Sequence, residues 1–584
     1  MPAIVITGFQ GEQPRIVPRL LPPNAAQDAI NVRLADGGLT PTRASTPVGA
    51  DAVAGAKTIV RHGASWLSWT GVVHAAAGPV DQSRLYITGD GAPKMRTSAG
   101  VVYPLAVPRP ASAPTATVQG VGAGDVVTRT YVYTFVTEFG EEGEPSAASA
   151  AVDWRPGNNV LLSDIQAPPA GRGITRQRFY RTQTGAQGTF FYLIADRSAS
   201  ALNFSDVVPP NAFAEPLPSV DWNPPPAALQ GLTAMPNGMM AGFVGKDLYF
   251  CEPFRPHAWP EKYVLTTDYD IVGLGAIGPA LIVATKGTPY IAVGGEPAAM
   301  QMARVEQNLP CINARGIVDL GFAICYPTWE GLVAVNPGGA AQIVTANLFS
   351  RDDWLSLKPN QMVAAQIAGR YAAFYNVDSG LRPQAGCVII DISGQQPWLS
   401  RSDVIATAAW FDTETGGLYY LPKASASIQR LDSPEGPPTL YYWRSKPFVI
   451  PAPDNFGIVL VDVDLARNGE EIALIQAQIE EIIARNAATI ASRMVRGAIN
   501  TLTINSAPLG GDMLERLPKT DVRLSVTISA DGRQVASTAV VNRPVRLPAG
   551  FKARAWEVSV SGDVRVERIT LASTVADLVQ SPPG

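Results

Sequence analysis

The sequence predicts a mainly β protein: an irregular β-propeller with an inserted immunoglobulin- or fibronectin-like sandwich and a C-terminal β domain that carries a long inserted helix. Three observations predict this class, namely turn residues spread along the chain, a repeat of hairpins, and one interval of helical periodicity. The 584 residues include 53 glycines and 50 prolines, which separate short apolar runs. This spacing is typical of many short strands joined by turns.

Composition excludes several other classes of protein. Hydrophobic residues make up 46% of the chain and charged residues only 16%, which excludes extensive disorder. The net charge of −4 excludes the strongly basic class of nucleic-acid binder. No run of about 18 apolar residues predicts a membrane-spanning helix, and the first residues lack the pattern of a signal peptide. The cysteines have no close pair spacing, so neither a CxxC zinc site nor a disulfide framework is expected.

The repeat consists of hairpins with an aromatic or aliphatic residue at the centre of the second strand. The five centres are Tyr249, Tyr290, Val333, Tyr375 and Tyr419, which are 41, 43, 42 and 44 residues apart. A period of this length is typical of propeller blades, which are small sheets that bury their faces against one another. The alternative is a chance spacing of hairpins within a β-sandwich.

Proline-rich stretches divide the chain into four predicted parts. We expect an N-terminal segment with the first propeller part at 1–107, an inserted sandwich at 108–218, propeller blades at 219–445, and a C-terminal β domain at 446–584. Within the second part, the residues TYVYTFVT alternate as a half-buried strand does. Near the N-terminus, Asn24 with Gln27 three residues later predicts a short capped helix before a hairpin.

A helical insertion is predicted at 468–497, inside the C-terminal β domain. Asn468 is a suitable N-cap with Glu471 at the third position, and basic residues lie near the end. Apolar side chains recur at spacings typical of one helix face: Ile472, Ile475, Ile479, Ile482, Ile483, Ile490 and Met494. Either the helix covers a face of its own sheet, or it forms an arm that contacts neighbouring subunits or lines a channel.

Catalytic and metal-binding motifs are not found in the sequence. The three histidines have no metal-ligand spacing, and the GxGxxG match that begins at Gly273 continues into a predicted strand rather than a helix. We therefore expect no cofactor, no metal centre and no enzymatic activity. One acidic turn offers oxygen ligands for a weakly bound cation through Glu138, Glu141, Glu142 and Glu144. The alternative is a solvated turn between two strands of the sandwich.

Several local phrases are similar to those of virion proteins from tailed bacteriophages. They are Arg19–Pro22, Gly38–Pro41, Thr137–Ser146, Glu330–Val333, Trp443–Phe448 and Arg546–Lys552. In this order, and together with the propeller period, they make the chain resemble the tail nozzle proteins of short-tailed phages, also called tail tubular protein B.

This resemblance implies a protein of the virion tail, assembled in the bacterial host cytoplasm. It implies a ring, usually a hexamer, below the portal and adaptor proteins, with docking surfaces for tail fibres or spikes. Double-stranded DNA would pass through the ring during genome ejection, and a chain of low charge suits passage because it does not hold phosphates tightly. The alternatives are a receptor- or glycan-binding module of the virion and, less favoured, a propeller glycosidase.

Overall fold

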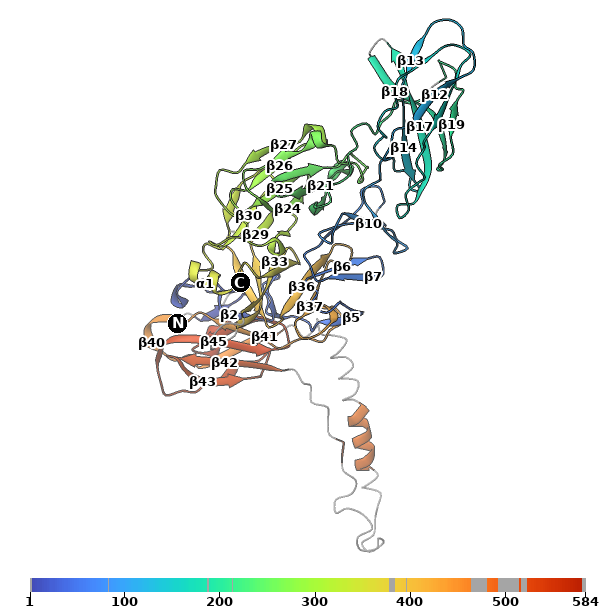
Figure 1. Ribbon diagram of the computed structural model, residues 1–584. Coiled ribbons are helices and arrows are strands. Elements are labelled where there is room, and N and C mark those ends of the chain that lie inside the picture. The colour runs from blue at the N-terminus through green and yellow to red at the C-terminus, as the bar shows by residue number, and fades with distance from the viewer. Residues whose placement is uncertain are drawn as a thin grey trace, which may run out of the picture. The chain divides into compact units, whose positions relative to one another are not determined.

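The computed structural model describes residues 3–81, 83–185, 188–212, 214–377, 384–394, 396–463, 481–491, 514–515 and 523–579. The protein is mainly β and contains many small sheets (Figure 1). Its chain divides into two compact units. Unit 1 comprises Met1–Thr46, Gln396–Asp403 and Asp432–Gly584, and unit 2 comprises Pro47–Gln395 and Val404–Leu431. The proline-rich stretches of the sequence instead predict boundaries after residues 107, 218 and 445.

Unit 2 contains four-stranded sheets in which strands consecutive in sequence pair antiparallel. One consists of β8 (His74–Ala77), β9 (Leu85–Thr88), β10 (Lys94–Arg96) and β11 (Val102–Pro104). The next consists of β20 (Gln230–Ala234), β21 (Met240–Val244), β22 (Asp247–Phe250) and β23 (Leu265–Thr266). It is followed by β24 (Ile271–Ile277), β25 (Ala280–Thr285), β26 (Tyr290–Val293) and β27 (Gln301–Arg304). Another consists of β28 (Val318–Asp319), β29 (Ile324–Pro327), β30 (Leu332–Val335) and β31 (Ala341–Ile343).

The later strands of unit 2 continue this arrangement. Strands β32 (Val363–Ile367), β33 (Arg370–Val377) and β34 (Gln384–Asp391) pair in that order. Strands β36 (Ala406–Asp412), β37 (Gly417–Pro422) and β38 (Ser427–Arg430) pair with β5 (Thr46–Asp51) from the beginning of the chain. A hairpin consists of β6 (Thr58–His62) and β7 (Ser65–Trp69). Short helices in the loops are η2 (Pro236–Gly238), η3 (Glu261–Tyr263), η4 (Pro297–Ala299), η5 (Ala314–Gly316) and α1 (Arg351–Ser356).

The first strands of these sheets contact one another in series. Strand β8 contacts β20, followed by contacts from β20 to β24, β24 to β28, β28 to β32, β32 to β36, and β36 to β6. An apolar cluster with Val60, Val73, Leu85 and Ile87 then joins the β6–β7 hairpin to β8 and β9. Similar clusters lie between consecutive sheets, such as the one in which Phe374 of β33 packs with Tyr420 of β37. Following the contacts from sheet to sheet therefore returns to the starting sheet.

The five predicted hairpins all form strands, but their centres are not all equivalent. Tyr249, Tyr290 and Val333 lie on the third strands of their sheets, β22, β26 and β30. Tyr375 and Tyr419 lie on β33 and β37, which are second strands counted from β32 and β36. The repeat seen in the sequence therefore marks hairpins, and its register moves by one strand between β30 and β33.

An inserted part of unit 2 has two facing layers of strands. One layer contains β12 (Thr115–Gln119), β16 (Asn159–Ser163) and β19 (Phe204–Asp206), and the other contains β14 (Tyr131–Thr137), β17 (Ile174–Gly185) and β18 (Gly188–Ser198). Short strands β13 (Val127–Arg129) and β15 (Val152–Trp154) pair beside them. Tyr133 and Phe179 stack at 5.7 Å within their shared core. Every residue of β14 is buried, because Val132 on its other face packs with Tyr180 and Leu217. The expectation of a half-buried strand is therefore wrong.

Unit 1 contains two sheets that share one apolar core. One sheet contains β35 (Trp398–Ser402), β2 (Ala26–Ile30), β39 (Tyr441–Ser445), β45 (Ala553–Gly562), β42 (Leu524–Ala530) and β43 (Arg533–Thr538), with β40 (Phe448–Asp454) also paired to β45. The other contains β1 (Ile4–Ile6), β46 (Val566–Ala572), β41 (Ile458–Val463) and β44 (Val545–Arg546). Short elements are η1 (Pro18–Leu20), β3 (Val32–Arg33), β4 (Thr40–Pro41) and α3 (Val575–Val579). Trp443 and Trp556 lie fully buried in the core.

The short helix expected after Asn24 is not formed. Residues Ala26–Ile30 are strand β2, which pairs antiparallel with β39 and parallel with β35. Ala26 and Ala29 are buried in the unit 1 core, and the backbone N–H of Ala29 donates to the Glu12 carboxylate. Pairing with a distant strand therefore overrides the local capping pattern.

Two valines of unit 1 test how far burial stabilises the paired sheets. Val558 of β45 is fully buried, whereas Val449 of the adjacent β40 is 59% exposed. We expect Val558→Ala to lower the free energy of unfolding by about 2 kcal/mol, because it removes buried methyl groups and leaves a cavity. Val449→Ala should change it by less than about 0.5 kcal/mol. Urea denaturation followed by tryptophan fluorescence measures both; equal losses would contradict the assigned core.

Candidate functional site

The predicted helical insertion is helical at residues 481–491. Ile482, Ile483 and Ile490 belong to this segment. The other residues of the proposed apolar face, Ile472, Ile475, Ile479 and Met494, lie outside the described residues, as do the predicted ends of the helix.

One face of the helical segment is apolar and accessible. Ile483 and Ile490 are 51% and 45% exposed. Their separation of seven residues places them on the same face, because two helical turns span about seven residues. Ile482 lies to one side and is partly buried. Exposed isoleucines seven residues apart form an apolar strip that association would cover.

Polar contacts lie next to this strip and opposite it: Asn486 is beside the isoleucines, three residues after Ile483, and Arg485 is on the opposite side of the segment. Arg485 Nε and Nη2 donate to Glu515 Oε1 and Oε2 at 3.0 and 2.9 Å, and Arg485 also pairs with Glu481. Asn486 exchanges two hydrogen bonds with the backbone of Glu515. Hydrogen bonding to Glu515 raises the pKa of Arg485, and the same contact lowers the pKa of Glu515. These contacts fix the rotation of the helical segment relative to Leu514 and Glu515.

The acidic turn after β14 is the second candidate from the sequence. Each of its four carboxylates has a protein partner. Glu138 accepts a hydrogen bond from the Tyr103 hydroxyl at 2.9 Å, and Glu144 accepts one from the Asn223 amide at 2.7 Å. Glu141 pairs with Arg172 and lies 3.7 Å from Arg84. Glu142 pairs with Arg178 at 2.8 Å. Among the described residues, no group of three or more histidine, cysteine or acidic side chains is arranged to hold a metal ion.

Glu142 is the most enclosed of these acids, with a side chain that is 2% exposed. Besides Arg178, its carboxylate accepts hydrogen bonds from the hydroxyls of Thr134 and Tyr180 at 2.8 and 2.7 Å. Burial and the adjacent carboxylate raise the pKa of Tyr180, so this hydroxyl stays a donor. A carboxylate with three donors is stable in a buried position because its charge is fully solvated by the protein. The alternative of a solvated turn is therefore wrong for Glu142.

His257 connects this turn to the loop after β22. Its side chain is buried, and Nε2 lies 3.0 Å from the backbone oxygen of Glu142. The partner is a carbonyl, so Nε2 carries the proton in this hydrogen bond. The imidazole also packs edge-on against Trp222, with ring centres 5.9 Å apart. Burial lowers the pKa of His257 to about 4, which keeps the ring neutral at pH 7. The part of the acidic turn at Glu141 and Glu142 is thus a buried junction between the inserted layers and the neighbouring sheets.

The cysteine thiols, which are the other side chains that could act as nucleophiles, are also buried in the core. Cys251, Cys311, Cys325 and Cys387 are free and buried, and burial raises the pKa of the Cys251 thiol to about 12. A thiol in this environment is not nucleophilic at neutral pH. Tryptophan rings, which could stack on a sugar, differ in exposure. Trp354 and Trp443 are fully buried, Trp398 and Trp410 are partly buried, and Trp329 is 45% exposed.

Two glutamates of the acidic turn test whether the buried junction stabilises the folded protein. We expect Glu142→Gln to lower the free energy of unfolding by about 3 kcal/mol, because it leaves buried donors without a charged acceptor. The same change at Glu144, Glu144→Gln, keeps an oxygen that can accept from Asn223 and should cost less than about 0.5 kcal/mol. Urea denaturation at pH 7 compares the two variants. Equal stabilities would contradict the role assigned to Glu142.

The buried imidazole predicts a dependence of stability on pH. His257 titrates near 6.5 when unfolded and at about 4 when folded, so between these values the unfolded chain binds more protons. Stability should therefore fall as the pH is lowered from 7 to 4.5, by about 2–3 kcal/mol from this group. In His257→Gln this part of the loss should disappear. Denaturation of both proteins at the two pH values measures the difference; identical pH dependence would contradict the neutral buried ring.

Comparisons with known proteins give no family. No family model matches the chain, and no curated protein matches it. Among solved structures, Hsv2 from Kluyvelomyces marxianus is 9% identical, with coverage of 51% of this chain and 70% of that chain and a TM-score of 0.20. A structural genomics protein of unknown function from Bacteroides thetaiotaomicron VPI-5482 is also 9% identical, with coverage of 55% and 98% and a TM-score of 0.19. TM-scores this low support no argument about fold or activity.

Proposed function

We propose that this protein is a structural component of a bacteriophage tail, a nozzle subunit whose ring continues the DNA channel below the portal and adaptor. The observation that carries the proposal is the series of contacts among the first strands of the sheets in unit 2, which returns to its starting sheet. Such a series supports a propeller-like scaffold, in which neighbouring sheets bury one another's faces. The order of sequence phrases that resembles tail nozzle proteins supplies the biological context.

The proposed architecture follows from the same contacts. Unit 2 is an irregular propeller, and the layers from β12 to β19 are an immunoglobulin- or fibronectin-like sandwich inserted after β11. Unit 1 is a β domain that carries the helical insertion. Two-layer packing around Tyr133 and Phe179 supports the sandwich, and the common core with Trp443 and Trp556 supports a separate unit 1.

The proposed role is mechanical, in the virion, rather than catalytic. The buried acids of the junction are engaged by arginines and hydroxyls, and the buried thiols are protonated, so both serve packing. Low net charge supports passage of double-stranded DNA without tight binding. Tail fibres or spikes, together with portal and adaptor proteins, are the proposed partners. In the part of the chain that the structure describes, no helix is long and apolar enough to cross a bilayer.

The helical segment supplies the proposed contact between subunits. The accessible strip of Ile483 and Ile490 is apolar, and the ion pair of Arg485 holds the opposite side toward its own chain. Heterologous contacts of this kind close a ring when the rotation between subunits closes. Burial of the two isoleucines would add about 2–3 kcal/mol each at a well-packed interface.

The double variant Ile483→Asp with Ile490→Asp tests this assignment. We expect it to prevent ring assembly while both units stay folded, because two carboxylates would be desolvated in the interface. The double variant Ala484→Asp with Ala488→Asp is the matched control, since both alanines are exposed away from the isoleucine strip and the variant receives the same two charges. Size-exclusion chromatography with light scattering measures the mass.

The outcomes separate the helix assignment from the nozzle proposal. A ring that survives the double variant refutes the interface role of this face. A wild-type protein that stays monomeric at high concentration, and shows no ring with a central hole in cryo-EM class averages, refutes the nozzle proposal itself. Specific binding of the monomer on a glycan array would then favour the receptor-binding alternative.

A further inference from the structure

Five strands of the contact series in unit 2 line one hollow of about 270 Å³, which neither the helical segment nor the acidic turn explains. The strands are β6, β8, β20, β32 and β36, and the short helix η5 completes the lining. Sites for drug-sized molecules typically measure about 300 to 1,000 Å³. This hollow lies just below that range, so it suits a smaller molecule, such as one aromatic ring with one substituent.

Most residues that line the hollow are apolar. Val60 of β6, Leu232 of β20, Val363 of β32 and Trp410 of β36 contribute from four different strands. Sites for small molecules are typically lined by such side chains, together with a few polar groups that fix the orientation of the ligand. The walls therefore favour a ligand with an apolar body.

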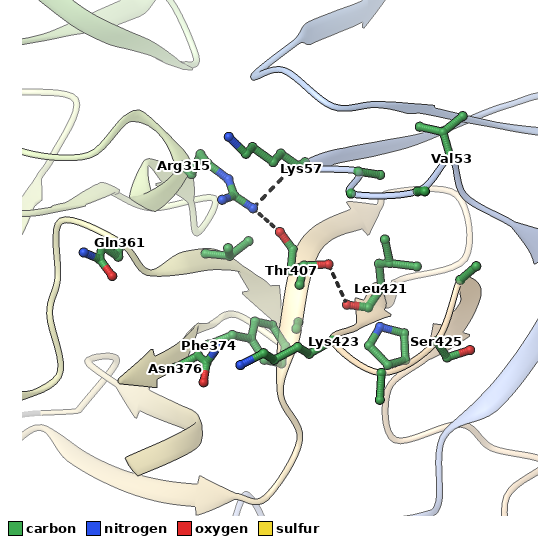
Figure 2. A pocket seen from close by; sticks show the side chains of 18 residues that line it. Val53, Lys57, Arg315, Gln361, Phe374, Asn376, Thr407, Leu421, Lys423 and Ser425 are labelled. Atoms are coloured by element: carbon green, nitrogen blue, oxygen red, sulfur yellow. Dashed lines mark hydrogen bonds between the residues drawn. The ribbon is translucent and has the colours of Figure 1, made fainter. Parts of the chain in front are cut away.

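Arg315 of η5 supplies a positive charge that is held in place. Its Nη2 donates to the backbone oxygen of Lys57 at 3.1 Å and to that of Thr407 (Figure 2). Within the described part of the chain Arg315 forms no ion pair with a carboxylate, and the lining of the hollow contains no acidic residue. Burial lowers the pKa of Arg315, which shows that its charged form is partly removed from water. An anion in the hollow would compensate this charge.

His74 of β8 adds a neutral polar group. Its Nδ1 is buried and has no hydrogen-bond partner among the described residues. Burial also lowers the pKa of His74, so the ring is uncharged at pH 7. The hollow thus combines one fixed guanidinium, one neutral imidazole and apolar walls.

The two ends of the hollow differ in character. A larger pocket of about 570 Å³ adjoins it and shares Lys57, Arg315 and Val363 with it (Figure 2). Leu232 and His74 line the hollow but not the larger pocket. A ligand in the hollow would therefore place its charged end at Arg315, beside the larger pocket, and its apolar end toward β20 and β8.

We propose that this hollow binds a small monocarboxylic acid with an apolar body. The carboxylate accepts hydrogen bonds from the guanidinium of Arg315, whose planar set of donors matches it. The apolar body packs against Leu232 and Trp410, where a second negative charge would be desolvated without a partner. The proposal does not depend on the nozzle function.

Isothermal titration calorimetry with the intact chain at low salt tests the site with three probes. Benzoate has both the carboxylate and the apolar ring, benzamide has the ring without the charge, and acetate has the charge without the ring. We expect benzoate to bind with a dissociation constant of about 1 mM or lower. Benzamide and acetate should bind at least fivefold more weakly. Absence of benzoate binding, or equal affinity for benzoate and either of the other probes, overturns the proposal.

Arg315→Gln tests the assigned cation, because it removes the charge and keeps a polar side chain. We expect it to weaken benzoate binding at least tenfold and to leave benzamide binding unchanged within twofold. Arg351→Gln is the matched control, since Arg351 is an exposed arginine of unit 2 outside the hollow and its replacement changes the net charge equally. It should alter benzoate affinity by less than twofold. Equal affinities of the two variants overturn the role of Arg315.

Ala364→Leu tests the hollow independently of Arg315, and it decides the question if circular dichroism shows that Arg315→Gln does not fold. Ala364 of β32 lines the hollow, so the larger side chain occupies part of the space proposed for the ligand. We expect benzoate binding to fall at least fivefold while the far-ultraviolet spectrum stays that of the wild type. Unchanged benzoate affinity in folded Ala364→Leu overturns the proposal.

Discussion

The structure of unit 2 depends on one constraint: a small sheet cannot bury both of its faces alone. Strands such as β25 and β29 are buried along their whole length, although each belongs to a sheet of only four strands. Their apolar side chains are removed from water only because the next sheet packs against them, as Ile282 does with Tyr326 and Val333. No single sheet is therefore an independent unit of stability, and each contributes to the burial of its neighbours.

The inserted layers obey a different constraint, because they have their own core and are joined to the neighbouring sheets through hydrogen bonds and ion pairs of the acidic turn. Glu142, Arg178 and His257 lie in a region where an unpaired polar group would lower the stability of the fold. Networks of this kind specify one geometry, since a shifted arrangement would leave buried donors without acceptors. An apolar contact of equal area would tolerate more sliding between the two parts.

Local sequence patterns predicted elements well and their partners poorly. The hairpin of β25 and β26 was predictable because apolar runs flank a glycine turn, and the strand after Gly278 excluded a dinucleotide-binding helix. The segment after Asn24 was mispredicted because its cap residues are local signals, whereas its strand partner β39 is more than 400 residues away. The same limit applies to sites. The turn with Glu141 was visible in the sequence, but its arginine partners were not, since Arg84 and Arg172 are distant along the chain.

The position of β5 has a consequence for biosynthesis. This strand leaves the ribosome early, yet it completes the sheet whose other members, β36, β37 and β38, are translated near the end of unit 2. Contacts of such long sequence separation carry a large entropic cost of loop closure and form slowly. A nascent chain therefore holds an unpaired strand edge while several hundred residues are synthesised. That exposed edge makes truncated or stalled products candidates for aggregation and for chaperone binding.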